Sequence, residues 1–136
     1  SYDILDFPSF YKKYNVEPVK LEDLLQRSDV ITLHLPFNES TENILDFDML
    51  SLIKKEAVLI NLARGGLIDE VELKSRLVKR TLFGAALDVF SVEPPIDTEF
   101  AHLENVLVTP HIGGSTEEAI LAMGRCAIEG LEEFNA

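Results

Sequence analysis

The stretch AVLINLARGG, residues 57–66, holds the pattern that decides the fold: an apolar run that ends abruptly at a glycine turn. Apolar runs recur in VITLHL (30–35), FGAALDV (83–89) and VLVT (106–109), and these lead into prolines. These runs are apolar at consecutive rather than alternate positions, which is typical of strands covered on both faces. Amphipathic stretches at 21–27, 47–56 and 70–80 separate them. Alternating strands and helices predict an α/β fold, a three-layer α/β/α domain around a parallel sheet.

Two helix starts and one further strand are predicted from local signals. Asp69 with Glu72, and Ser115 with Glu118, have the spacing of a capping box, so each is expected to begin a helix. The short segment 16–19 is rich in valine and is expected to add an edge strand.

The last predicted helix, from about residue 116 to residue 134, is the longest. It carries a stripe at helical spacing that comprises Ala119, Met123, Cys126, Ala127, Gly130 and Phe134. We expect Met123 and Cys126 to pack in the core, because soft apolar side chains at such positions usually do so.

The composition excludes several functional classes. Twelve Lys and Arg against twenty-four Asp and Glu give a net charge of −12, so binding to nucleic acid or to an anionic membrane surface is not expected. The single cysteine, Cys126, cannot form an internal disulfide, and no apolar stretch is long enough to span a bilayer. The sequence therefore predicts a cytoplasmic domain, and its scattered histidines predict no metal site.

Chemically active residues follow the predicted strands, at the edge where ligands bind in open parallel sheets. The groups at these strand ends are His34, Arg64, Gly65, Gly66, Asp88, Glu93, His111, Gly113 and Gly114. Each residue also has a structural explanation: glycines serve turns, and an arginine or a histidine is often only a solvated surface charge. Their joint occurrence at all the strand ends favours a functional site.

Three of these residues suit proton and hydride chemistry on a carboxylic acid. The planar guanidinium of Arg64 matches a carboxylate through two parallel hydrogen bonds. The imidazole of His111 can take a hydroxyl proton and return it, because histidine titrates near neutral pH. The carboxylate of Glu93 would orient His111 and stabilise its protonated form.

Four segments resemble the signatures of a known family. They are DVITLHLP (29–36), NLARGGLIDE (61–70), ALDVFSVEPP (86–95) and TPHIGGSTEEA (109–119), and they are similar to motifs of the D-isomer-specific 2-hydroxyacid dehydrogenases. The form HIGGSTEE most resembles the D-3-phosphoglycerate dehydrogenase branch. The resemblance covers nearly the whole chain and implies an NAD-dependent oxidoreductase that acts on a small 2-hydroxy or 2-oxo acid.

The resemblance also implies roles for individual residues. Arg64 matches the substrate-binding arginine, Glu93 the carboxylate that pairs with the catalytic histidine, and His111 the acid and base. The implied cofactor-binding set is Asp3, Leu62, Ala63, Arg64, Asp88, His111, Gly113 and Gly114. In this set Asp88 lies near the nicotinamide, and Asp3 ends a strand and binds the adenosine ribose. An acid at that position favours NAD over NADP.

The sequence departs from the family in one respect. None of its seven glycines forms the G-x-G-x-x-G pattern of the diphosphate-binding loop. Residues 1–136 are therefore expected to be the second half of a Rossmann-type domain, without the diphosphate-binding half and the substrate domain, and inactive alone. A homodimer is expected, because an exposed apolar edge strand pairs readily with another copy. Two alternatives stay open: a non-enzymatic, corepressor-like binding module, and a self-associating half-domain without activity.

Overall fold

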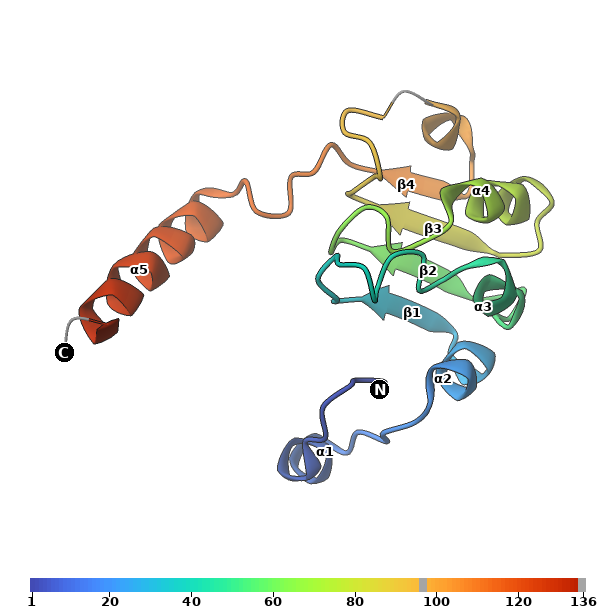
Figure 1. The fold of residues 1–136 in the computed structure, drawn as a ribbon. Coiled ribbons are helices and arrows are strands. Elements are labelled where there is room, and N and C mark those ends of the chain that lie inside the picture. Colours follow the sequence, from blue (N-terminus) through green and yellow to red (C-terminus); the bar gives the residue numbers. More distant parts are fainter. Residues whose placement is uncertain (96–97, 135–136) are drawn as a thin grey trace.

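The computed structural model describes residues 1–95 and 98–134 and contains a parallel sheet of four strands in the order β1-β2-β3-β4 (Figure 1). The strands are β1 (Val30–Leu33), β2 (Val58–Asn61), β3 (Gly84–Leu87) and β4 (Val106–Val108). Each lies inside one of the four predicted apolar runs and is shorter than the run. The α/β class and the parallel sheet are confirmed.

The helices lie before, between and after the strands. They are α1 (Pro8–Tyr14), α2 (Leu21–Arg27), α3 (Phe47–Ser51), α4 (Glu70–Val78), the 3-10 helix η1 (Glu99–His102) and α5 (Glu117–Phe134). Helix α2 has the predicted bounds, whereas α3 and α4 end earlier than expected. At the start of α4 the carboxylate of Asp69 accepts hydrogen bonds from the amides of Val71 and Glu72, so the predicted cap is confirmed.

The core lies between one face of the sheet and helices α2, α3 and α4. Leucines dominate it: Leu25, Leu33, Leu50, Leu59, Leu73, Leu77 and Leu87 are all buried there. Strands β1 and β2 bury alternate residues, as Ile31 and Leu33 show in β1. Burial of leucines from these three helices against this face holds the sheet in place.

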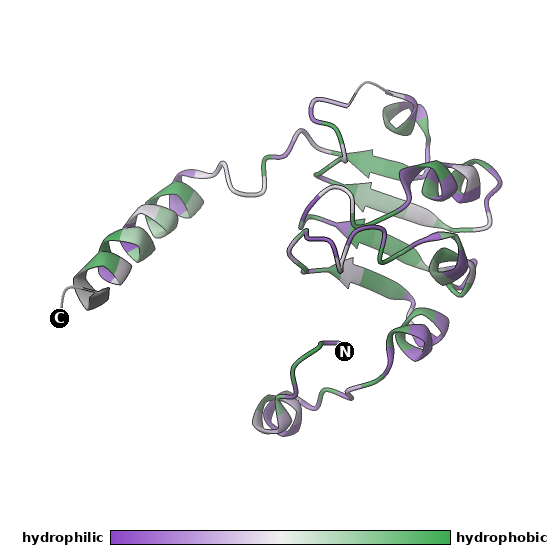
Figure 2. Ribbon diagram, in the orientation of Figure 1, coloured by the Kyte–Doolittle hydropathy of each residue, from purple (hydrophilic) through white to green (hydrophobic). Residues whose placement is uncertain are grey.

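The opposite face of the sheet is apolar and open. Thr32, Ile60, Ala86 and Leu107 lie side by side in register across the strands, and Leu107 is 65% exposed. Figure 2 shows that the strands are hydrophobic along most of their length. The consecutive apolar pattern predicted a second helical layer. The described part of the chain places helices α2–α4 on one face only (Figure 1).

Two local predictions are wrong. Residues 16–19 lie in the described part of the chain and form no strand; the amide of Val19 binds the carbonyl of Ser1 instead of a sheet neighbour. Helix α5 begins one residue later than Ser115 would place it, and the hydroxyl of Thr116 accepts the hydrogen bond from the amide of Ala119. Thr116 rather than Ser115 therefore caps this helix.

Helix α5 extends away from the sheet at the end of an extended segment (Figure 1). Met123 is 57% exposed and Cys126 is also exposed, so the prediction that they pack in the core is wrong. The side chain of Phe134 lies outside the described residues. Helical spacing of apolar residues predicts a face that needs a partner, but it does not say that the partner belongs to the same compact body. No helix in the described residues is both long and apolar enough to cross a membrane.

Candidate active site

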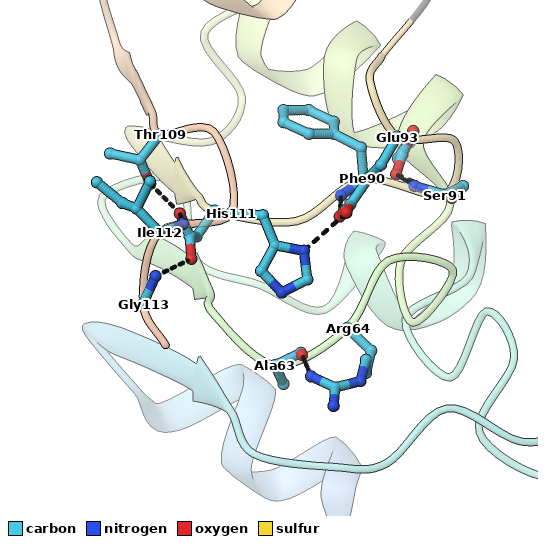
Figure 3. Close-up of polar contacts among 11 residues, drawn as sticks. Ala63, Arg64, Phe90, Ser91, Glu93, Thr109, His111, Ile112 and Gly113 are labelled. Atoms are coloured by element: carbon cyan, nitrogen blue, oxygen red, sulfur yellow. Dashed lines mark hydrogen bonds and ion pairs between the residues drawn. The ribbon is translucent and has the colours of Figure 1, made fainter. Parts of the chain in front are cut away.

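The carboxyl ends of β2, β3 and β4 bring three loops together at one edge of the sheet (Figure 3). The loop after β2 carries Arg64, the loop after β3 carries Glu93, and the loop after β4 carries His111. Parallel pairing puts these ends on the same side, because Asn61 is in register with Leu87 and Leu87 with Val108. Residues far apart in the sequence thereby become neighbours.

The Arg64 turn is held by an amide side chain. Asn61 is only 3% exposed; its Nδ2 donates to the carbonyl of Arg64 at 2.9 Å, and its Oδ1 accepts from the amide of Ala63 at 3.1 Å. Gly65 then lies against the carbonyl of Phe90, so closely that an added Cβ would be 1.9 Å from that oxygen. Only glycine fits there without moving the backbone. The guanidinium of Arg64 donates to the carbonyl of Ala63 at 2.6 Å.

Glu93 and His111 form a pair. Oε2 of Glu93 lies 2.7 Å from Nδ1 of His111, and Oε1 of Glu93 accepts from the amide of Phe90 at 3.0 Å. The hydrogen bond from His111, with a smaller contribution from the Phe90 amide, holds the pKa of Glu93 below its ordinary value. Figure 3 shows the imidazole between Glu93 and Arg64, with its second nitrogen on the Arg64 side.

Asp88 organises the loop that carries His111. The side chain is 3% exposed and accepts hydrogen bonds from the hydroxyl of Thr109 and, at 2.9 Å each, from the amides of Ile112 and Gly113. Burial by itself raises the pKa of Asp88, but these hydrogen bonds outweigh it and the pKa lies below the ordinary value. They fix the turn in which His111 adopts a positive φ of 53°.

Two cavities meet at the pair. Arg64, Glu93 and His111 line the first, of about 490 Å³, together with Phe37 and Phe90. The second, of about 320 Å³, is lined by Asp88, Phe90, Glu93, Pro94, Pro95, Val108, Thr109, Pro110 and His111. The first offers charged groups to a small polar molecule. The second has mostly apolar walls that suit a flat ring.

The other predicted residues are placed as follows. Ala63 adjoins Arg64, Leu62 is exposed, and Gly113 and Gly114 follow His111 on an open stretch where a Cβ at Gly114 would meet no atom within 4 Å. Asp3 lines a different cavity, along β1, and residues 1–3 form no strand there, contrary to expectation. Among the described residues, no group of three His, Cys, Asp or Glu side chains could hold a metal ion.

Sequence reasoning missed three contributors to the site. Asn61 could have been found, because a lone amide inside an apolar run needs hydrogen-bond partners. Thr109 and Glu70 gave no local signal, since their partners Asp88 and Ser91 each lie 21 residues away in the chain.

Known proteins are similar to this chain over most of its length. Residues 3–113 match the family model of the D-isomer specific 2-hydroxyacid dehydrogenase NAD-binding domain. The chain is 44% identical over 113 residues to D-3-phosphoglycerate dehydrogenase of Methanocaldococcus jannaschii, which covers 83% of this chain and 22% of the relative. It is also 44% identical over 112 residues to hydroxypyruvate reductase of Thermotoga maritima, which covers 80% of this chain and 37% of the relative.

Solved structures show the same architecture. A D-lactate dehydrogenase from Sporolactobacillus has a TM-score of 0.84 at 36% identity, over 94% of this chain and 42% of that one. The D-lactate dehydrogenase of Aquifex aeolicus, solved with NAD and lactic acid, has a TM-score of 0.83 at 28% identity, over 98% of this chain and 44% of that one. The chain thus spans less than half the length of these relatives. It belongs to the D-isomer-specific 2-hydroxyacid dehydrogenase family, and its residues 3–113 match the NAD-binding domain of that family.

Proposed function

We propose that this chain is the catalytic half of the NAD-binding domain of a longer NAD-dependent dehydrogenase, which interconverts a small D-2-hydroxy acid and its 2-oxo acid. The observation that carries the proposal is the Glu93–His111 pair, 2.7 Å apart, in one cavity with Arg64. The curated relatives are longer, which supports a larger parent protein. D-3-phosphoglycerate is the first substrate to test.

The proposal gives a task to each of the three side chains. Arg64 binds the substrate carboxylate and orients the adjacent carbon. Nδ1 of His111 is engaged by Glu93, so the remaining ring nitrogen, Nε2, takes the hydroxyl proton during oxidation and returns it during reduction. Glu93 fixes the ring and stabilises the protonated imidazole, as carboxylates do in other histidine-based sites.

The residues beside His111 fit the reactive end of NAD. The apolar walls of Phe90, Pro94 and Val108 suit a flat ring, and the open backbone at Gly114 leaves room for one. NAD supplies the acceptor for the hydride when it is bound. The chain alone is expected to bind NAD weakly, because no G-x-G-x-x-G loop is present to hold the diphosphate. Micromolar binding to the 136-residue chain by calorimetry would contradict this.

Substitutions in the longer enzyme test the assignment. His111→Ala should lower kcat by about 10²–10⁴-fold, the usual contribution of a general acid and base. Arg64→Ala should raise KM strongly and also lower kcat, since binding and orientation both depend on it. Glu22→Ala, on α2 away from the site, is the control and should leave both constants unchanged. Near-normal turnover by His111→Ala would overturn the proposal.

We also propose that the chain forms a homodimer. Three surfaces support this: the outer edge of β1, the open face of the sheet and the exposed apolar residues of α5. Pairing with another copy would satisfy the strand edge and bury the apolar side chains. Val30 on β1 is 59% exposed, and on α5 Ile120, Leu121 and Leu131 are each more than half exposed. Light scattering should give about twice the chain mass of 15.2 kDa. A monomer at tens of micromolar would contradict the proposal.

A further inference from the structure

Phe90 and Ser91 lie where three parts of the chain meet. The amide and the hydroxyl of Ser91 both donate to Oε1 of Glu70, at 2.7 and 2.8 Å. The carbonyl of Phe90 faces Gly65 in the Arg64 turn, and the amide of Phe90 donates to Glu93. The two adjacent residues Phe90 and Ser91 therefore link helix α4, the Arg64 turn and the Glu93 carboxylate that holds His111. Figure 3 shows both residues beside Glu93.

Glu70 is a firm anchor for such a link. It is the first residue of α4, and this helix is fixed by the Asp69 cap and by the buried side chains of Leu73 and Leu77. The amides of the first turn of α4 are served by Asp69, so the Glu70 carboxylate is left to bind the loop after β3. A charged acceptor with two donors restrains a loop more strongly than a neutral one.

We propose that Glu70 is a positioning residue for the Glu93–His111 pair: through Ser91 it fixes the segment 90–93, and with it the direction from which Glu93 reaches His111. Its relevance to catalysis rests on the proposed function. The positioning itself is a property of the folded chain and can be measured without turnover.

Glu70→Ala tests the proposal in the 136-residue chain by amide hydrogen exchange and by carbon NMR of the Glu93 carboxyl. The Ser91 amide should exchange about tenfold faster or more, since it loses its acceptor. The Phe90 amide should also exchange faster, because Glu93 no longer holds it steadily. The pKa of Glu93 should rise toward the ordinary glutamate value of about 4.3.

The direction in which the pKa of Glu93 changes distinguishes a loss of positioning from the mere loss of the Glu70 charge. Removing the negative charge of Glu70 would by itself lower the pKa of Glu93, because a nearby like charge disfavours ionisation. Glu70→Gln removes that charge but keeps an oxygen acceptor for Ser91. It should therefore keep Phe90 protected and should not raise the pKa of Glu93.

The control is Glu22→Ala, which removes the same charge from the first turn of α2 and should change neither readout. If Glu70→Ala does not fold, Ser91→Ala removes one of the two hydrogen bonds and should speed Phe90 exchange by roughly two- to fivefold. The proposal is overturned if Phe90 exchange and the pKa of Glu93 stay unchanged in the variant that folds. These readouts need no activity, so a failed dehydrogenase assay would not alter them.

Discussion

The loops that carry Arg64 and His111 lie at the same edge of the sheet but are held by different forces. The Arg64 turn depends on neutral contacts, namely the Asn61 amide and the close packing of Gly65 on Phe90. The His111 loop depends on the ionised carboxylate of Asp88, which binds one hydroxyl and two amides. The candidate substrate-binding residue is thus fixed by shape, and the candidate proton carrier by charge.

Because the two loops are held by different forces, they should respond to different changes. A loop fixed by packing responds to added volume and little to pH. A loop fixed by a carboxylate responds to loss of that charge, because its amides then lose their acceptor. Four changes, taken from the largest expected effect to the smallest, test this contrast.

Gly65→Ala should be the most damaging. Its Cβ would lie 1.9 Å from the carbonyl oxygen of Phe90 and 2.6 Å from the amide nitrogen of Ser91, so the backbone must move. Overpacking of this kind costs about 3 kcal/mol in the free energy of unfolding, measured by urea denaturation. Gly114→Ala is the matched control and should cost little, since its Cβ would meet nothing within 4 Å. If the two substitutions lowered the free energy of unfolding equally, close packing at Gly65 would not be what holds the Arg64 turn.

Asp88→Ala should cost about 2 kcal/mol, because the amides of Ile112 and Gly113 and the hydroxyl of Thr109 lose their common acceptor. Amide exchange should show the loss of protection at Ile112 and Gly113. The Ala63 amide, which binds Asn61, should stay protected. Loss of protection at all three amides would mean that the two loops are one unit.

Acid should loosen the His111 loop selectively. The pKa of Asp88 is lowered in the folded chain, so its contribution to stability is complete above the unfolded value of about 3.9 and is lost as pH falls through the folded value. Protection of Ile112 and Gly113 should therefore decrease below about pH 3.9, while that of Ala63 should persist. Asp88→Asn should abolish this pH dependence; if it persists in that variant, another group is responsible.

Thr109→Val should have the smallest effect. It removes one of the three donors to Asp88 and retains the shape of the side chain, at a cost of roughly 0.5–1.5 kcal/mol. Because a hydrogen bond to the ionised carboxylate is lost, the pKa of Asp88 should rise, measured by carbon NMR. If the pKa of Asp88 stays the same in Thr109→Val, the Thr109 hydroxyl does not stabilise the ionised carboxylate.

The sequence predicted those parts of the fold that depend on local signals. The four apolar runs contain the four strands, and the Asp69 cap is confirmed, because strand burial and helix capping are determined within a few residues. The loops that carry Arg64, Glu93 and His111 were also predicted to meet, since the carboxyl ends of parallel strands share one edge. The cofactor contacts of Asp3, Leu62, Asp88 and Gly113 stay predictions.

The errors concern partners that are distant in the sequence. Segment 16–19 has the residues of a strand but no neighbouring strand in the described chain, and Met123 has the spacing of a core residue but no surface against it. Nothing in the sequence indicated that the Asp88 oxygens bind the loop of His111, more than 20 residues away. Pairings over such distances are fixed by the tertiary fold and leave no local pattern.

The strand order has a consequence for how the chain folds during synthesis. Each strand lies beside the one made just before it, in the order β1-β2-β3-β4. A new strand can therefore join the growing sheet as it leaves the ribosome, and no completed pair has to open to admit a later one. Contacts between consecutive units keep the entropy cost of loop closure small and favour rapid, stepwise folding. Within this segment, β2, β3 and β4 can therefore each pair with the strand that precedes it in the sequence.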